Sequence, residues 1–172
     1  AAGNQGDRRF YSRFYPRRLK AEVLLDAISA ATGQHTTFKD YPAGTRSLEL
    51  PDSNVASRFL NTFGRPDRVI TCECERSDEP SMVQVLHIVN GNTLNDKLAS
   101  KTNRIAGWLD AGLPDYRIVE SIYLASLSRY PTNREMSETL KIFAGTPADK
   151  KRELIEDVFW SVISTKEFLF NH

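Results

Sequence analysis

The sequence has little of what defines several common protein classes. Its 172 residues include only two cysteines and three histidines, and the formal net charge is +1. Two cysteines are too few for a scaffold held together by disulfides. A net charge so close to zero gives no global attraction to nucleic acid or to a membrane surface, so we expect no nucleic acid as a partner. The sequence also lacks the ~18–20 consecutive apolar residues that a membrane-spanning helix needs, so we expect no membrane span.

What remains has the composition of one globular domain. Apolar residues make up 40% of the chain and charged residues 26%, which is ordinary for a folded protein, and the length suits one hydrophobic core. Residues 1–7 are small and polar and lack the apolar segment of a signal peptide, so we expect them to be disordered or a linker. Residues 8–172 are predicted to form a single helical domain.

The spacing of the apolar residues predicts a mainly α-helical fold, because they recur at three- and four-residue intervals over most of the chain. Pro16 and Gly33 are expected to start and stop the first helix. A capping box of Thr132 and Glu135 precedes a later one, which Gly145 is expected to end. The expected helices cover about residues 16–32, 55–63, 81–89, 94–111, 115–127, 133–144 and 147–163.

The expected architecture is an orthogonal helical bundle with a loop-rich insertion at about residues 34–80. Within that insertion, residues 47–50 and 68–76 alternate between apolar and polar side chains. Such alternation is typical of β-structure and predicts one or two short strands there.

Two cysteines in the second alternating segment are the first candidates for chemistry. Cys72 and Cys74 would share one face with Ile70, about 6.6 Å apart if extended, close to the ~6.8 Å limit for a disulfide, so we expect none between them. A metal would need two more ligands, and His35 and His87 are the only histidines nearby in sequence. We favour buried small apolar residues and assign no metal ligand, while a redox or metal site remains the alternative.

That alternative defines an enzymatic module with its site in the region of residues 65–87. Its candidate catalytic residues are Cys72, Cys74 and His87. The region is also rich in acidic residues, and paired carboxylates can act as acid and base where burial separates their pKa values. A solvated, ion-paired loop explains the same charges without catalysis.

Basic and aromatic residues are interleaved near the N-terminus. Residues 8–20 hold six basic side chains and four aromatic ones, a mixture that binds polyanions through guanidinium forks and ring faces. The candidate binding residues are the five arginines Arg8, Arg9, Arg13, Arg17 and Arg18. Since a core helix follows directly, we favour packing on the domain or against an upstream domain, and we predict that these arginines are mostly paired.

Seven segments of the sequence carry a resemblance to a known family. They are SRFYPRRLKAEVLLDAI (12–28), GTRSLELPD (44–52), FLNTFGRPDR (59–68), CECER (72–76), the segment 84–97, SIYLASLSRYPTNREM (121–136) and STKEFLFNH (164–172). In this order they resemble, from about Arg8 to His172, the planctomycete-type C-terminal domain of unknown function (domain of unknown function 1553). The resemblance implies a piece of a large exported protein, periplasmic or at the cell surface, with an N-terminal cytochrome-c-like domain.

The same resemblance bears on cofactors and partners. It implies a second helical domain upstream and a sulfatase-like protein encoded nearby as a further partner, and it carries no established catalytic residue. The chain itself has no Cys-x-x-Cys-His motif, by which c-type haem is attached. We therefore expect no cofactor on this chain, with haem only on an upstream domain that this chain lacks.

These observations favour a non-catalytic helical interaction module of an exported multidomain protein, which docks on upstream domains or on a partner protein. Two alternatives stay open. One is the redox or metal-dependent enzymatic module at residues 65–87. The other is binding of a polyanion, such as an acidic polysaccharide, through the N-terminal arm.

Overall fold

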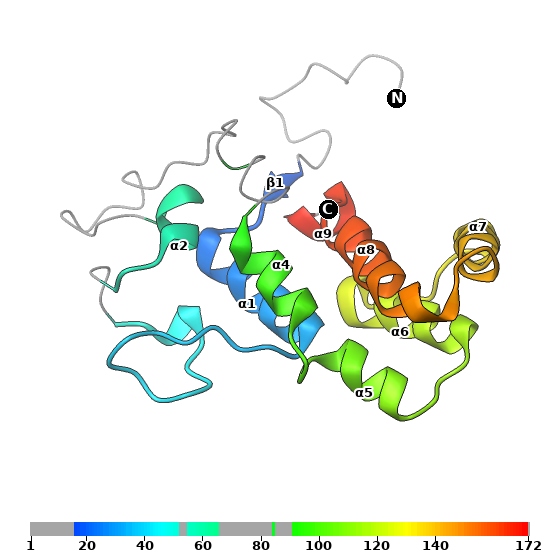
Figure 1. Cartoon of the computed structure of the whole chain (residues 1–172). Helices are drawn as coiled ribbons and strands as arrows, with labels where there is room; N and C mark the ends of the chain where they lie inside the picture. The colour runs from blue at the N-terminus through cyan, green and yellow to red at the C-terminus, as the bar shows by residue number, and fades with distance from the viewer. Residues whose placement is uncertain (1–15, 52–54, 66–83, 85–90, 172) are drawn as a thin grey trace, which may run out of the picture.

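The computed structural model describes residues 16–51, 55–65, 84 and 91–171, and they form a mainly helical fold, as expected (Figure 1). Its elements in chain order are β1 (Arg17–Arg18), α1 (Ala21–Thr32), the 3₁₀ turn η1 (Ser47–Glu49), α2 (Arg58–Thr62), α4 (Asn92–Ala99), α5 (Arg104–Asp110), α6 (Asp115–Leu127), α7 (Asn133–Ala144), the 3₁₀ turn η3 (Ala148–Lys150), α8 (Lys151–Ile163), α9 (Lys166–Leu169) and β2 (Phe170–Asn171). No helix among these residues is long and apolar enough to cross a membrane.

Four helices enclose the core. Helix α1 packs against α4 and α6, and α8 packs against the same two helices, so that the four close a ring. Helix α7 lies at the outer edge of the molecule, on α6 and α8 (Figure 1). The short α9 follows α8 and contacts both α6 and α8.

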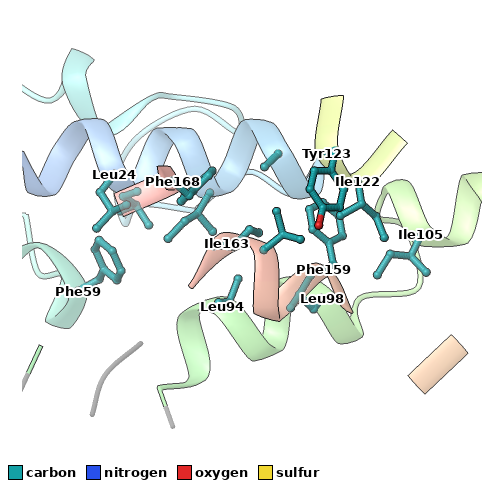
Figure 2. Close-up of a cluster of buried hydrophobic side chains, with 14 of the residues drawn as sticks. Leu24, Phe59, Leu94, Leu98, Ile105, Ile122, Tyr123, Phe159, Ile163 and Phe168 are labelled. Carbon is teal, nitrogen blue, oxygen red and sulfur yellow. The ribbon is translucent and has the colours of Figure 1, made fainter. Parts of the chain in front are cut away.

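The core is continuous from α2 to α5. Leu24 and Phe59 lie at one end of the cluster and Ile105 at the other, with Phe159 between Tyr123 and Leu98 (Figure 2). Helix α8 places an apolar residue in this core at nearly every turn, so it is the central helix of the fold. Its buried residues are Ile155, Phe159, Val162 and Ile163.

Several helix ends are as the sequence predicts. Gly33 ends α1 with φ of 72°, and a Cβ there would lie 3.0 Å from Cγ of Arg104, so both conformation and space require glycine. The capping box of Thr132 and Glu135 at the start of α7 is confirmed. Gly145 caps the C-terminal end of that helix.

The predicted strand at residues 47–50 is wrong, because Ser47–Glu49 form the 3₁₀ turn η1. The carboxylate of Asp26 on α1 accepts hydrogen bonds from the backbone N–H groups of Ser47 (2.8 Å) and Leu48 (3.2 Å). These long-range bonds turn the chain, and no local pattern of apolar residues encodes them.

The predicted start of the first helix is also wrong. Helix α1 begins at Ala21 and not at Pro16, because the antiparallel β1–β2 ribbon pairs Arg17 with Asn171 and Arg18 with Phe170. Helix α6, by contrast, spans Asp115–Leu127 as predicted.

The single helix predicted over residues 94–111 is divided into α4 and α5. Asn103 makes the break: its side-chain amide donates to the carbonyl oxygens of Lys97 (3.0 Å) and Leu98 (2.5 Å). Its side-chain oxygen accepts from the backbone N–H of Ala106 and so caps α5. One buried asparagine thus ends one helix and starts the next. The other predicted segments, 68–76 and 81–89, lie outside the described residues apart from Gln84.

Candidate functional site

The structure places two of the predicted site residues, Arg17 and Arg18, next to each other on β1. The remaining arginines of the arm and the catalytic candidates lie outside the described residues; they are Arg8, Arg9, Arg13, Cys72, Cys74 and His87. Among the residues that are described, no group of three or more histidine, cysteine, aspartate or glutamate side chains could hold a metal ion.

Arg18 points into the fold. Its guanidinium group donates to the side-chain oxygen of Gln84 and to the carbonyl oxygen of Phe63 (3.1 Å), and it lies 5.4 Å from the centre of the Phe63 ring. Gln84 donates in turn to the carbonyl oxygen of Thr62 (3.1 Å). Arg18 therefore joins β1 to the end of α2, whereas Arg17 is exposed and has no ion pair within the described part of the chain.

An open hollow of about 580 Å³ lies beside the β1–β2 ribbon. Among the described residues its walls are Pro16, Lys166, Glu167 and Phe170. Pro16 is exposed and Phe170 is half-buried. Apolar surface is therefore accessible to solvent at the point where the preceding chain enters the domain.

A polar cluster surrounds the C-terminal half of α1. The Asp26 carboxylate, whose side chain is 12% exposed, lies 2.6 Å from the hydroxyl of Ser47 and 3.6 Å from Nε of Arg46. A cavity of about 110 Å³ adjoins Asp26 and is lined by Asp26, Ser29, Ala30, His35, Thr36, Thr45 and Arg46. The cluster fastens the loop that follows α1 back onto that helix.

Two cations from later elements reach the same helix end. Lys97, on α4, donates from Nζ to the carbonyl oxygen of Gln34 (2.6 Å). Arg104, on α5, donates from Nε and Nη2 to the carbonyl oxygen of Ala30 (3.3 and 3.2 Å). Helix α1 has no basic residue in its own last turn, so these side chains supply the positive charge that a helix C-terminus favours.

A second polar centre, the Arg129 clasp, joins α6, α7 and α9. Arg129 donates from Nε and Nη2 to Glu167 (2.6 and 2.8 Å) and from Nη1 and Nη2 to Glu135 (both 3.0 Å). Its fifth N–H donates to the carbonyl oxygen of Tyr130 (3.1 Å), so every guanidinium donor is used. The group also lies 5.3 Å from the centre of the Tyr123 ring.

Comparison with known families decides the identity at the family level. A family model described as PSD1, a protein of unknown function (DUF1553), matches residues 1–143. The chain belongs to the PSD1 family. Neither a curated protein nor a solved structure matches it.

The PSD1 match ends within α7, so α8 and α9 follow the matched residues. Of the seven segments that carry the family resemblance, only STKEFLFNH at 164–172 lies beyond the matched residues. The SRYPTNRE segment of this PSD1 chain contributes Arg129 to the clasp, Thr132 as N-cap and Glu135 as the partner of both.

The capping box of the PSD1 chain was predicted from the sequence, whereas the Arg129 clasp and the burial of Lys97 were not. Glu167 is 38 residues from Arg129, and no local spacing relates them. Lys97 lies three residues after Leu94 and so on the edge of the apolar stripe of α4, which was a usable sign that this lysine is buried.

Burial lowers the pKa of Lys97 from 10.5 to about 8, and the negative charge of Asp26 opposes this shift. The residue is 8% exposed, so desolvation of the ammonium group outweighs the attraction. At neutral pH the PSD1 chain therefore holds a buried charge at a cost in stability.

We predict that Lys97 makes the domain more stable as the pH rises. A lowered pKa of a base means that the unfolded chain binds more protons between pH 8 and 10.5, so the free energy of unfolding increases with pH in that window. Between pH 7 and 9.5 the wild-type chain should gain about 2 kcal/mol relative to Lys97→Met. Urea unfolding of both proteins at several pH values measures this, and parallel pH profiles would contradict it.

The Arg129 clasp also makes stability rise with pH, but in an acidic window. Hydrogen bonds from Arg129 lower the pKa of Glu135 from 4.5 to about 2, assisted by the backbone N–H of Thr132. The two carboxylates raise the pKa of Arg129, with Glu167 the larger cause. A lowered carboxyl pKa gives stability that is present above pH 4.5 and is lost as the pH falls towards 2.

We predict that Arg129→Lys lowers the free energy of unfolding by about 1–2 kcal/mol near pH 7, because lysine cannot form the five-donor fork. The variant should also lose less stability than wild type between pH 4.5 and 2. Thermal melts across this range test both effects. The control is Arg117→Lys, which alters an exposed ion pair with Glu120 on α6 and should change little; equal effects of the two variants would count against the clasp.

Proposed function

We propose that this PSD1 chain is a non-catalytic helical interaction module of a larger exported protein, and that it docks on the domains that precede it. The observation that carries the proposal is the open hollow beside the β1–β2 ribbon. There the chain enters the domain, its last residues pair with the entering strand, and the rings of Pro16 and Phe170 offer apolar surface to a neighbour.

The cationic side chains that bind between distant elements support a structural use. Lys97 and Arg104 bind backbone carbonyls at the end of α1, and Arg129 uses all its donors on α7, α9 and its own loop. Each group joins elements that are distant in sequence. Such contacts make the module rigid, and a rigid surface loses less conformational entropy on docking.

Hydrogen exchange on the intact parent protein tests the proposal. Amides of α9 and β2 should exchange at least about tenfold more slowly in the parent than in residues 1–172 alone, because docking covers the hollow and suppresses local opening. The amides of α5, which lies far from the ribbon (Figure 1), are the internal control. Equal rates in α9 and β2 would refute docking at this surface.

The polyanion alternative has a test of its own. If the arm is paired within the protein, a heparin column should retain the chain weakly, and replacing Arg8, Arg9 and Arg13 by alanine should change little. The internal position of Arg18 supports this expectation. Tight, salt-sensitive retention that the triple variant loses would favour the polyanion function instead.

A further inference from the structure

The cavity of about 110 Å³ beside Asp26 lies between the C-terminal half of α1 and the loop that follows, and it shares no described residue with the hollow at the ribbon. Its polar walls are held by the fold. Ser29 is 6% exposed, and the side chain of Asp26 is 12% exposed. Of the described residues that line the cavity, Ala30 alone is apolar. The cavity is therefore suited to a small polar molecule.

Two hydroxyl groups of the lining use their hydrogens on the backbone. Oγ of Ser29 donates to the carbonyl oxygen of Leu25, and Oγ1 of Thr45 donates to that of Pro42, both at 2.8 Å. Each hydroxyl oxygen keeps the capacity to accept a hydrogen bond. Acceptors of this kind favour a ligand that donates, and a primary ammonium group brings three N–H donors together with a positive charge.

The cavity also presents charges of both signs. Within the described residues, Oδ1 of Asp26 accepts two hydrogen bonds from Ser47, whereas Oδ2 accepts one, from the backbone N–H of Leu48. Nε of Arg46 lies 3.6 Å from Oδ2. His35, which is exposed, lines the same cavity. A simple anion would meet the carboxylate and a simple cation would meet the guanidinium group, so a ligand with both charges matches the cavity best.

We propose that this cavity binds the zwitterion of a small α-amino acid, with its ammonium group on Asp26 and its carboxylate on Arg46 and His35. The ammonium nitrogen and the carboxyl carbon of an amino acid are about 2.5 Å apart. Oδ2 of Asp26 and Nε of Arg46 are 3.6 Å apart, so each charge of the ligand lies opposite its own partner. A guanidinium group also offers the fork of donors that a carboxylate accepts.

The size of the cavity restricts the ligand to the smallest amino acids. A volume of about 110 Å³ corresponds to roughly four water molecules, which suits glycine or alanine and excludes phenylalanine. The two parts of the site come from α1 and from the loop at residues 35–46, so a bound amino acid fastens the loop to the helix and stabilises the folded chain. This function is additional to docking, and neither depends on the other.

Titration of this chain with glycine and with L-alanine, followed by NMR of the backbone amides, tests the site. The amide signals of Ser29, Thr36 and Thr45 should shift in a saturable manner, with a Kd in the millimolar range or tighter. Acetate and methylamine each carry one of the two charges and should bind at least about tenfold more weakly. L-Phenylalanine should leave the same signals unchanged.

Arg46→Ala should weaken glycine binding at least about tenfold, because the ligand carboxylate loses its charged partner. The Arg46 side chain is 59% exposed, and Arg46→Gln gives the same comparison if the alanine variant does not fold. The matched control is Arg134→Ala, an exposed position on α7 outside the cavity, which should bind glycine like wild type.

Three outcomes would overturn the proposal. The first is the absence of saturable shifts with both glycine and L-alanine. The second is binding of acetate or methylamine as tight as that of glycine, which would show that one charge suffices. The third is glycine binding that Arg46→Ala leaves unchanged or that Arg134→Ala weakens equally.

Discussion

Removal of residues 165–172 is expected to cost the domain at least about 4 kcal/mol, a large part of the 5–15 kcal/mol that stabilises a typical domain. Phe168 is buried against the core, and losing a buried phenylalanine side chain alone costs about 3–5 kcal/mol. The truncation also removes Glu167 from the Arg129 clasp and leaves β1 without its partner strand. The chain should therefore unfold at a much lower urea concentration.

Two point variants separate these contributions. Phe168→Ala should produce most of the loss, while Lys166→Ala, at an exposed position of the same short helix, should remain within about 0.5 kcal/mol of wild type. Equilibrium urea unfolding measures all three proteins. If the truncated chain melts like the full one, the tail is a free peptide and the pairing of β1 with β2 contributes nothing.

Asp26→Ala is expected to lower the free energy of unfolding by about 2–4 kcal/mol. The carboxylate accepts hydrogen bonds from the backbone of Ser47 and Leu48 and lies beside the Ser47 hydroxyl, and Ser47 is 2% exposed. Alanine leaves these donors without an acceptor, and bonds to charged groups are worth about 1.5–3 kcal/mol each. The loop that follows α1 should also become open to limited proteolysis.

Asp96→Ala is the matched control for Asp26→Ala. Asp96 lies exposed on α4 and has no hydrogen bond or ion pair within the described residues, so its replacement should stay within about 0.5 kcal/mol of wild type. Proteolysis at residues 34–51 that is equally slow in wild type and Asp26→Ala would show that other contacts hold the loop.

The helices were predictable where their signals are local. The 3.6-residue period, the Thr132–Glu135 capping box and the glycines at positions 33 and 145 depend only on neighbouring residues, and all are found in the structure. The errors arise where a distant residue decides the local conformation. Hydrogen bonds to Asp26 hold residues 47–49 in a 3₁₀ turn. Pairing with β2 near the C-terminus places Arg17–Arg18 in a strand and not in the first helix.

In the candidate sites, too, local features were predictable and long-range contacts were not. Arg17 and Arg18 are adjacent in sequence, but their different roles follow from the register with Phe170 and Asn171, which the sequence alone does not encode. The Arg129 clasp depends on a pair separated by 38 residues. The fold places these partners together through the packing of α6, α7 and α9, so only the capping half of the clasp was predictable.

The β1–β2 ribbon brings together two chain positions that a circular permutation would join. Because Arg17 and Asn171 are paired neighbours, a short linker could join the two ends of the described fold without moving any helix. New ends could then be opened in the exposed turn at residues 145–147, between α7 and η3, as circular permutation requires. In such a permuted chain α8, α9 and both strands would precede α1, and the ribbon would become an ordinary hairpin.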